Sequence, residues 1–329
     1  MSSLAASVEA IVRAAGSHVP LLLARVEERL AELASGHGPV LAEHAGETIA
    51  AGGKRLRPLL VLLTAGPAAA QESDLVAAAA AVELVHSATL VHDDVLDAAQ
   101  LRRGLPTVWA HGGRALAIAT GDLLFSRAFS ELAATGSLAA VRALSRAGSA
   151  LAEGELLQRE DAWNADVAVA RYLYRCELKT ARLFEAACEL GALAAAAPGA
   201  TVSSLGAFGR GIGLAFQLLD DVLDVSAPAS STGKQRGADL LDGTVTLPLI
   251  LARERDPTLA AMDLREIDRP ERAAEVCERI EATGALADAT ARAIAIVAEA
   301  KAEVASLALE DGQRLALDLV ADSVVDREN

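Results

Sequence analysis

The chain has 329 residues, of which 52% are apolar, 3% aromatic and 23% charged, and its formal net charge is −15. This acidity argues against a nucleic-acid-binding surface, because such surfaces are basic. Ala and Leu dominate the apolar residues, and Val and Ile form no alternating runs, so we expect helices packed on helices in an all-α fold. No linker is long enough to divide residues 1–329 into separate domains.

Apolar residues recur at helical spacing along almost the whole chain, separated by short breakers of Gly and Pro. The longest irregular segment, Ser226–Gly243, is a candidate lid, because a long loop in a compact domain is usually functional. The alternative is a plain surface excursion. The expected helices are, in chain order, Leu4–Ala15, Val19–Ala34, Pro39–Ala50, Leu56–Thr64, Ser73–Asp97, Ala115–Ala134, Leu138–Trp163, Val167–Ala196, Thr201–Asp224, Thr246–Arg253, Ala273–Thr283, Leu286–Leu307 and Glu310–Arg327.

The cysteines and the N-terminus indicate the cellular compartment of the protein. Cys176, Cys188 and Cys277 form neither a zinc-binding spacing nor a disulfide framework, so we interpret them as buried apolar residues in a reducing cytosol. The N-terminus has no basic segment followed by an apolar core, which predicts no signal peptide. The most apolar runs are short or interrupted by Pro, Glu and His, so none is expected to cross a membrane, and a cytoplasmic protein is predicted.

Two aspartate clusters of the form Asp-Asp-Val-Leu-Asp occupy residues 93–97 and 220–224. Residues at i and i+4 of a helix share a face, so Asp93 lies beside Asp97, and Asp220 beside Asp224. Stacked carboxylates repel one another unless a cation neutralises them, and hard oxygen ligands suit Mg2+, which also takes phosphate oxygens. Two clusters facing a helical cavity would hold a metal–diphosphate assembly. The alternative, two solvated acidic helix faces, fits less well because both clusters have apolar neighbours.

Basic residues stand near both clusters. In Gly-Gly-Lys-Arg-Leu-Arg-Pro at 52–58, the glycines allow close backbone approach, and Lys54 and Arg57 can converge on one anion. Arg102 and Arg103 follow the first aspartates, and arginine forks suit phosphate oxygens. Lysines at 179 and 234 add further possible anion contacts, although a lone lysine is usually a solvated surface residue.

Several other polar residues fall at helical spacing from the aspartates. Gln217 lies one turn before Asp220 and faces the same way, and His86 lies two turns before Asp93, where it could donate a hydrogen bond to a phosphate. The remaining histidines show no spacing that indicates a metal site. No Ser-His-Asp order, phosphate-binding loop or dinucleotide fingerprint is present. Mg2+ and diphosphate without a nucleophile indicate ionisation to a carbocation.

With these motifs in this order, the chain resembles the all-trans polyprenyl diphosphate synthases from about Leu41 to Arg327. The motifs that carry the resemblance are Gly-Gly-Lys-x-x-Arg-Pro at 52–58, Glu-Leu-Val-His at 83–86, His-Asp-Asp-x-x-Asp at 92–97, Arg-Arg-Gly-x-Pro-Thr at 102–107, Gly121-Asp122, Glu155 with Gln158, Lys179-Thr180-Ala181, Phe216-Gln217-x-x-Asp-Asp-x-x-Asp and Thr232-Gly233-Lys234.

The resemblance implies the isoprenoid synthase fold, an all-α bundle around a central cavity, usually as a homodimer with three Mg2+ ions. Asp93, Asp97, Asp220 and Asp224 would bind the ions, supported by Asp94 and Asp221. The allylic diphosphate would be held by Arg102, Lys179, Gln217 and Lys234, and isopentenyl diphosphate by Gly53, Lys54, Arg57, His86 and Arg103. Thr180 and Gln217 would also stabilise the developing carbocation, with released pyrophosphate as the final base.

One departure from the family pattern is the run Gly-Thr-Val-Thr-Leu-Pro at 243–248, in which Thr244 replaces a usual lysine. One diphosphate contact is therefore weakened or supplied elsewhere, and we expect a raised demand for Mg2+ or a higher apparent KM.

The size of the side chains just before the first aspartates predicts the product length. Ala88 and Thr89, five and four positions before Asp93, are small and would leave the path of the growing chain open. We therefore predict a long product of about C30 to C45, made from a farnesyl or geranylgeranyl primer for a quinone side chain. The alternatives are a C20 geranylgeranyl diphosphate synthase, a terpene cyclase, which would normally lack the isopentenyl site, and a non-catalytic subunit of a two-component synthase, which would be expected to have lost the aspartates.

Overall fold

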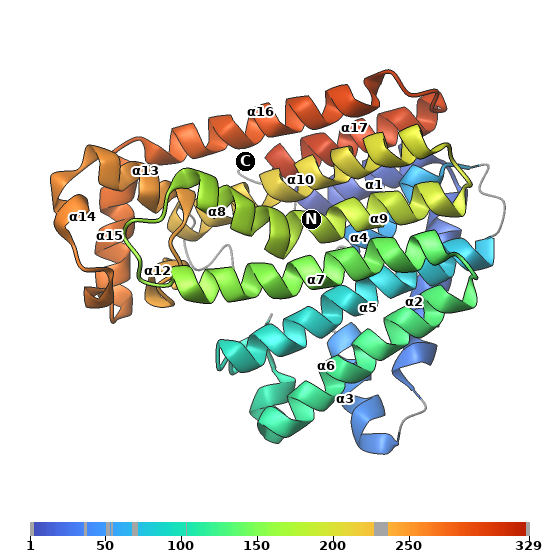
Figure 1. The fold of residues 1–329 in the computed structure, drawn as a ribbon, viewed down its shortest axis with the longest axis horizontal. Helices are drawn as coiled ribbons and strands as arrows, with labels where there is room; N and C mark the ends of the chain where they lie inside the picture. Colours follow the sequence, from blue (N-terminus) through green and yellow to red (C-terminus); the bar gives the residue numbers. More distant parts are fainter. Residues whose placement is uncertain are drawn as a thin grey trace. The chain divides into compact units, whose positions relative to one another are not determined.

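The computed structural model describes residues 3–35, 38–50, 53, 55–67, 72–102, 104–226 and 236–326. Within these ranges almost all regular structure is helical, and the sole sheet is the hairpin of β1 (Leu101–Arg102) and β2 (Leu105–Pro106), so the all-α prediction is confirmed (Figure 1). The helices are α1 Ser3–Ala15, α2 His18–Ala34, α3 Pro39–Ala50, α4 Leu56–Ala65, α5 Glu72–Leu96, α6 Val108–Ala134, α7 Leu138–Asp161, α8 Val169–Cys176, η1 Glu177–Ala181, α9 Arg182–Ala194, α10 Gly199–Ser226, α12 Ala238–Leu241, α13 Leu247–Arg255, α14 Pro257–Ala261, η2 Leu264–Glu266, α15 Pro270–Ala282, α16 Ala285–Ala305 and α17 Asp311–Val325.

The largest departures from the expected helices have local causes. The segment expected as one helix over 167–196 is divided by η1, a π-helical turn. Helix α6 begins seven residues before the expected start at Ala115, because the turn before Gly113 joins it across a kink where Gly113 has φ 69° and ψ −174°. The short elements α12, α14, η2 and the hairpin carry too few periodic residues to be recognised from sequence.

The chain divides into two compact units, which are described separately. Unit 1 comprises Met1–Gly148, Leu183–Gly209 and Glu303–Val320, and unit 2 comprises Ser149–Arg182, Arg210–Ala302 and Ala321–Asn329. The single-domain interpretation stays a prediction.

In unit 1, α5 and α6 lie side by side (Figure 1). Their close approach requires Gly121, because a Cβ built there would lie 2.2 Å from Nε2 of His92. Helices α4 and α9 meet in the same way at Gly191, where a Cβ would lie 2.1 Å from the carbonyl oxygen of Val61. The contact at Gly121 holds α5, which carries the first aspartates, against α6.

Helix α5 is also long and apolar enough to cross a membrane, as is α10, by length and composition alone. The expectation that no run would reach that length is therefore corrected. The apolar window of α5 has mean hydropathy 1.5 and is 72% buried inside the protein, and that of α10 is 50% buried. A core helix of a soluble protein passes the same test, because it too is apolar on most faces.

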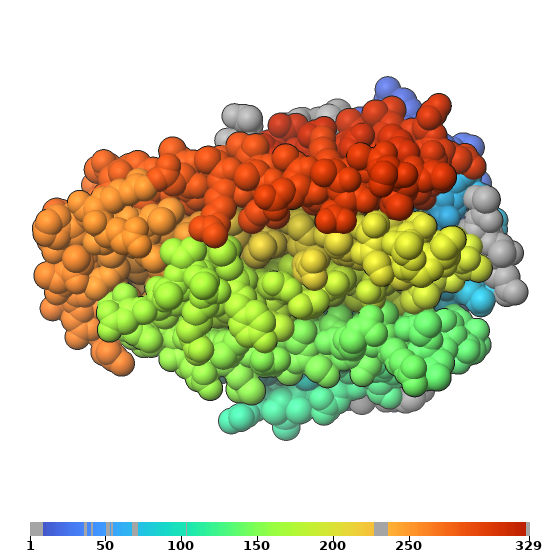
Figure 2. All heavy atoms as spheres, turned by 45° about the horizontal axis from the view of Figure 1, so that its top comes forward, coloured from blue at the N-terminus to red at the C-terminus, as the bar shows by residue number. Residues whose placement is uncertain are grey.

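In unit 2, α16 shows the pattern of a helix that packs along one stripe. Its buried positions recur at Ala285, Ala289, Ala293, Val297 and Ala300. This spacing of three to four residues puts all of them on one face. Most of its other positions are exposed, and they form part of the orange-red surface in Figure 2.

Candidate active site

The first aspartate cluster lies at the C-terminal end of α5, in unit 1. Asp97 is exposed, Asp93 is half-buried and Asp94 is buried, so the three carboxyl groups divide between an open face and the helix packing. Helix α5 ends at Leu96, and Asp97 lies in the turn that follows, where Ala98 has a positive φ of 49°, a conformation unusual for a residue with a Cβ. Two carboxylates one turn apart on a solvent-accessible face are a donor set that fits Mg2+.

Arg102 holds the buried member of this cluster. Its Nε and Nη2 both lie 2.8 Å from Oδ1 of Asp94. Burial raises the pKa of Asp94 above its ordinary value, although the guanidinium opposes the shift. The hairpin that carries Arg102 is fixed by Thr107, whose hydroxyl donates to the carbonyl of Ala99 at 2.6 Å and accepts from the amide of Ala110 at 3.0 Å. Arg102 thus holds Asp94 from a strand whose partner strand is followed by the anchored Thr107.

A pocket of about 300 Å³ opens beside this end of α5. Arg55, Glu83, His86, Asp94 and Arg102 line it, so both basic and acidic groups reach its wall. Its size suits part of a small anionic ligand. The predicted isopentenyl-site residue His86 and the predicted allylic-site residue Arg102 therefore share one pocket, which Arg57 does not line.

Two arginines at the start of α4 have different surroundings. Arg55 has φ 47° and binds Glu83 at 2.8 Å, Glu27 at 2.5 Å and the carbonyl of Ile49 at 2.9 Å. The guanidinium carbon of Arg57 lies 4.6 Å from the centre of the Phe184 ring, and its buried Nε has no hydrogen-bond partner. Burial lowers the pKa of Arg57 to about 10, which leaves it protonated at neutral pH. The sequence singled out Arg57 and missed the structural role of Arg55.

In unit 2, Lys179 and Thr180 lie on the π-helical turn η1. Such turns are rare and frequently occur at functional sites. Gly154 on α7 makes room for this turn, since a Cβ there would lie 2.5 Å from the backbone nitrogen of Lys179. The ammonium of Lys179 is paired with Glu155. Burial favours the neutral form of Glu155, but Lys179 and Arg159 outweigh it and lower the pKa of this carboxyl.

A hydrogen-bonded chain connects η1 to the second aspartate cluster. The hydroxyl of Thr180 donates to Oε1 of Gln217 at 2.7 Å, and Nε2 of Gln217 donates to Oδ1 of Asp221 at 2.7 Å. The hydroxyl of Tyr172 donates to the other oxygen, Oδ2, at 2.6 Å. Burial raises the pKa of Asp221 to about 7, against the effect of these two donors. The sequence predicted Thr180, Gln217 and Asp221 but missed Tyr172.

The other two aspartates of the second cluster lie on the more open side of α10. Asp220 is exposed, and Asp224 is half-buried, with its Oδ2 accepting from the amide of Asp239 at 3.2 Å. The backbone carbonyl of Asp224 accepts from the amide of Gly237 at 2.9 Å, so the chain returns to the end of α10 after residues 227–235. As in the first cluster, two carboxylates one turn apart are a donor set that fits Mg2+.

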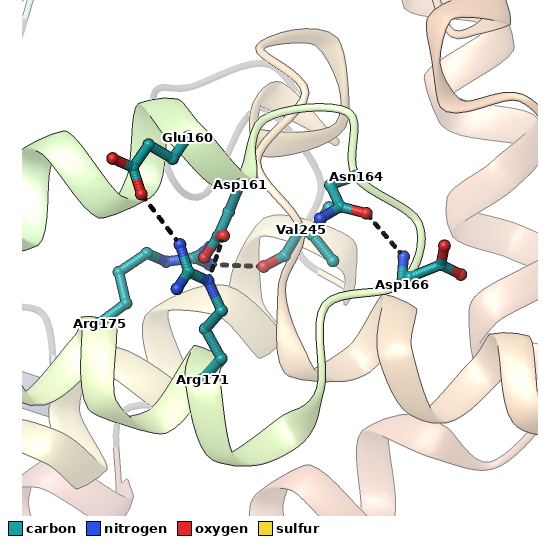
Figure 3. A network of polar contacts seen from close by, with 7 residues as sticks. All are labelled: Glu160, Asp161, Asn164, Asp166, Arg171, Arg175 and Val245. Atoms are coloured by element: carbon teal, nitrogen blue, oxygen red, sulfur yellow. Dashed lines mark hydrogen bonds and ion pairs between the residues drawn. The ribbon is translucent and has the colours of Figure 1, made fainter.

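The run in which Thr244 replaces a lysine is held by a buried ion pair (Figure 3). Arg175 binds Oδ2 of Asp161 at 3.2 Å and donates to the carbonyl oxygen of Val245 at 2.5 Å. Arg171 binds Oδ1 of the same aspartate. Both Asp161 and Arg175 are almost fully buried. A buried ion pair is costly to break, because the remaining charge has no partner, so this network fixes the backbone beside Thr244.

Gly243 at the start of that run is closely packed. It has φ 73°, and a Cβ there would lie 2.2 Å from the ring of Trp163. Its carbonyl oxygen accepts from the amide of Trp163 at 2.8 Å. Neither the ion pair nor this packing was predicted from the sequence.

Some predicted residues lie outside the described part of the chain. These are Lys54, Arg103 and Lys234, together with residues 227–235, which are half of the candidate lid. Gly53 is described and exposed.

Comparison with known proteins identifies the family. The sequence profile described as polyprenyl synthetase matches residues 39–282, which include both aspartate clusters, η1 and the Gly243–Pro248 run. The chain belongs to the polyprenyl synthetase family.

Its relatives include synthases whose names give products of different lengths. The chain is 42% identical over 241 residues to heptaprenyl diphosphate synthase component 2 of Geobacillus stearothermophilus, covering 73% of this chain and 75% of that protein. It is 36% identical over 283 residues to the geranylgeranyl diphosphate synthase of Methanosarcina mazei, covering 84% and 87%. A crystal structure of polyprenyl synthase from Caulobacter crescentus, complexed with calcium and isoprenyl diphosphate, superimposes with a TM-score of 0.90 at 37% identity over 98% of both chains.

Membership of the polyprenyl synthetase family indicates the reaction that the protein catalyses. The protein is a transferase, an all-trans polyprenyl diphosphate synthase of isoprenoid biosynthesis with the isoprenoid synthase fold. Its substrates are prenyl diphosphates. Within this chemistry, Asp94 and Asp221 share one feature: protein donors hold Oδ1 of Asp94 and both carboxylate oxygens of Asp221.

Proposed function

We propose that this trans-prenyltransferase makes a long product of about C30 to C45 from an allylic diphosphate, such as farnesyl or geranylgeranyl diphosphate, and isopentenyl diphosphate. The observation that carries the proposal is the small side chains on α5 one turn before the first aspartates. Ala88 is fully buried, and Thr89 turns its hydroxyl to the carbonyl of His86 at 2.8 Å. The names of two relatives support the long product: heptaprenyl diphosphate synthase component 2 of Geobacillus, and an octaprenyl diphosphate synthase of Escherichia coli that is 39% identical over 204 residues.

The carboxylates would hold Mg2+, with Asp93 and Asp97 taking two ions and Asp220 and Asp224 a third. Bound Mg2+ would neutralise the diphosphate leaving group. The fixed contacts of Asp94 with Arg102, and of Asp221 with Tyr172 and Gln217, would keep the two clusters in place.

The other site residues would position the two substrates. Lys179, Gln217, Arg102 and Lys234 would hold the allylic diphosphate, and Thr180 and Gln217 would place their dipoles toward the developing carbocation. Isopentenyl diphosphate would be held by Gly53, Lys54, Arg57, His86 and Arg103, with His86 acting from the wall of the 300 Å³ pocket. Released pyrophosphate would accept the final proton.

The assembly we propose is a cytoplasmic homodimer that supplies a quinone side chain. A second candidate is a synthase that needs a different partner subunit, which the component 2 name of the Geobacillus relative favours. A geranylgeranyl (C20) product is the alternative for chain length, and the Methanosarcina relative carries that name.

The test is an incubation of the purified protein with farnesyl diphosphate, labelled isopentenyl diphosphate and Mg2+, followed by separation of the dephosphorylated products by length. Products of C30 or longer are expected. A C20 product would overturn the long-chain proposal and leave the transferase intact. If elongation occurs only after a cell extract is added, the partner-subunit candidate replaces the homodimer.

Variants on α5 test the steric argument directly. Ala88→Phe and Thr89→Phe should each shorten the product, because an aromatic ring fills the space that the growing chain needs. Thr89 is only half-buried, so Thr89→Phe decides if Ala88→Phe does not fold. Ala119→Phe, at an exposed position of α6, is the matched control and should leave the product unchanged.

A further inference from the structure

Unit 1 contains a cluster of metal-ligating side chains that is not part of either aspartate cluster. His44 and Glu47 lie one turn apart on α3, and His111 lies in the first turn of α6. One ligand atom from each of the three lies within 4.8 Å of the other two. The sequence did not predict this set, because His111 is remote from the other two along the chain and the packing of α3 against α6 brings them together.

One distance within the set already matches the distance between two ligands of a bound ion. Nδ1 of His44 lies 3.2 Å from Oε2 of Glu47, and ligand atoms of a tetrahedral ion with bonds of about 2.1 Å are about 3.4 Å apart. The rings of His44 and His111 meet edge to face, with centroids 5.9 Å apart and an interplanar angle of 84°. Small side-chain rotations would therefore complete the set. The side chain of His44 is only 12% exposed, so its position is largely fixed by its neighbours.

The backbone under His111 is also fixed. Thr107 caps the first turn of α6, and the amide of His111 donates to the carbonyl of Thr107 at 3.1 Å. The kink at Gly113 follows within two residues, so His111 lies on a short turn that is separate from the long part of α6. On α3, the hydroxyl of Thr48 donates to the carbonyl of His44 at 2.8 Å. An ion at this place would tie the capped turn to α3.

The ligand chemistry selects the class of ion. Two imidazoles and one carboxylate suit Zn2+ and related transition metals, whereas Mg2+ prefers oxygen ligands alone. Glu47 and His111 also line the 300 Å³ pocket, together with Arg102 and His86. Three protein ligands leave a coordination position open to water or to an anion in that pocket. We propose that His44, Glu47 and His111 form a binding site for one transition-metal ion of the Zn2+ class at the wall of this pocket.

The test measures metal binding rather than turnover. The full-length protein is stripped with a chelator and then titrated calorimetrically with Zn2+ in a large excess of Mg2+, which occupies the aspartate clusters. A parallel titration with Co2+ follows the visible absorption that imidazole-ligated Co2+ gives and that ions held by water and carboxylate give only weakly. His44→Ala and His111→Gln remove one ligand each. His18→Ala removes an imidazole outside the cluster and is the matched control.

We expect one Zn2+ per chain with excess Mg2+ present, and at least a 100-fold loss of affinity in His44→Ala and in His111→Gln, since even loss of a group behind a metal ligand costs about 10- to 100-fold. The His18→Ala control should bind as the original protein does. No Zn2+ binding in excess Mg2+, or Zn2+ binding by both ligand variants that is as tight as binding by the original protein, overturns the proposal. His111 is exposed, so His111→Gln should fold with an unchanged metal-free Tm and decides the outcome if His44→Ala does not fold.

Discussion

The two aspartate clusters have the same sequence, Asp-Asp-Val-Leu-Asp, and different supports. In the first, the middle carboxylate is held by the charged guanidinium of Arg102. In the second, the middle carboxylate is held by two neutral donors, Tyr172 and Gln217, and burial raises the pKa of Asp221 to about 7. One motif thus occurs in two electrostatic environments. The motif fixes which carboxylates share a helix face, whereas burial raises the pKa of each middle carboxylate against donors that differ between the two clusters.

The outer carboxylates should give the largest effect. Asp93→Ala and Asp220→Ala should each lower kcat by about 1,000-fold, the order expected when one group that stabilises developing charge is removed. Steady-state rates at saturating substrates over a range of Mg2+ concentrations test this. Asp268→Ala, which removes an exposed carboxylate paired with the neighbouring Arg269, is the control and should retain full activity. A cluster whose loss leaves kcat unchanged would not be a metal site.

Removing each support should destabilise the protein by different amounts. Arg102→Met leaves the buried Asp94 without its charged partner and should cost about 2 kcal/mol in the free energy of unfolding. Tyr172→Phe removes one neutral donor to Asp221 and should cost about 1 kcal/mol. Urea unfolding of the metal-free proteins measures both values. Equal losses would show that the difference between the two supports has no energetic consequence.

The pH dependence of stability separates the clusters further. The pKa of Asp221 is raised to about 7, above the value of about 3.9 in an unfolded chain. The folded state then binds this proton more tightly than the unfolded chain does. Protonation of Asp221 therefore contributes fully to the free energy of unfolding below about pH 4, and this contribution is lost as the pH rises through about 7. Urea midpoints of the metal-free protein should therefore fall relative to Asp221→Asn over this range. A constant difference between the two proteins would contradict the expectation.

The smallest effect concerns the run that starts at Gly243. Thr244→Lys restores the usual lysine and should lower the Mg2+ concentration needed for half-maximal rate, or the apparent KM, by a few-fold, because one more cation reaches the diphosphate. The backbone there is fixed by Arg175, so the new side chain should not disturb the run. An unchanged Mg2+ requirement would show that the contact is supplied by another group.

The part of the site that could be predicted is the part encoded by local spacing. Asp93 and Asp97, or Gln217 and Asp221, lie one turn apart on a helix, and helical periodicity alone places them together. The same periodicity could not reveal η1, because a single π turn hardly alters the apolar pattern, and the contact that accommodates it comes from Gly154 on α7.

Residues brought together by packing could not be predicted from the sequence. Tyr172 reaches Asp221, Arg175 reaches Val245, and His111 reaches His44, each across a long separation in the chain. The one available signal for Tyr172 was the small number of tyrosines in the chain. The chain has only 2 tyrosines, and a buried hydroxyl needs a hydrogen-bond partner.

Ala98, directly after the first aspartates, has a left-handed backbone with φ 49°. This conformation should limit which amino acids selection tolerates at the position. Glycine relaxes that conformation, and asparagine tolerates it, whereas valine or isoleucine would crowd their own backbone. In a saturation library selected for a functional product, codons for glycine and asparagine should accumulate at this position and those for β-branched residues should disappear. A residue with the smallest of side chains would then be among the more constrained sites in the gene.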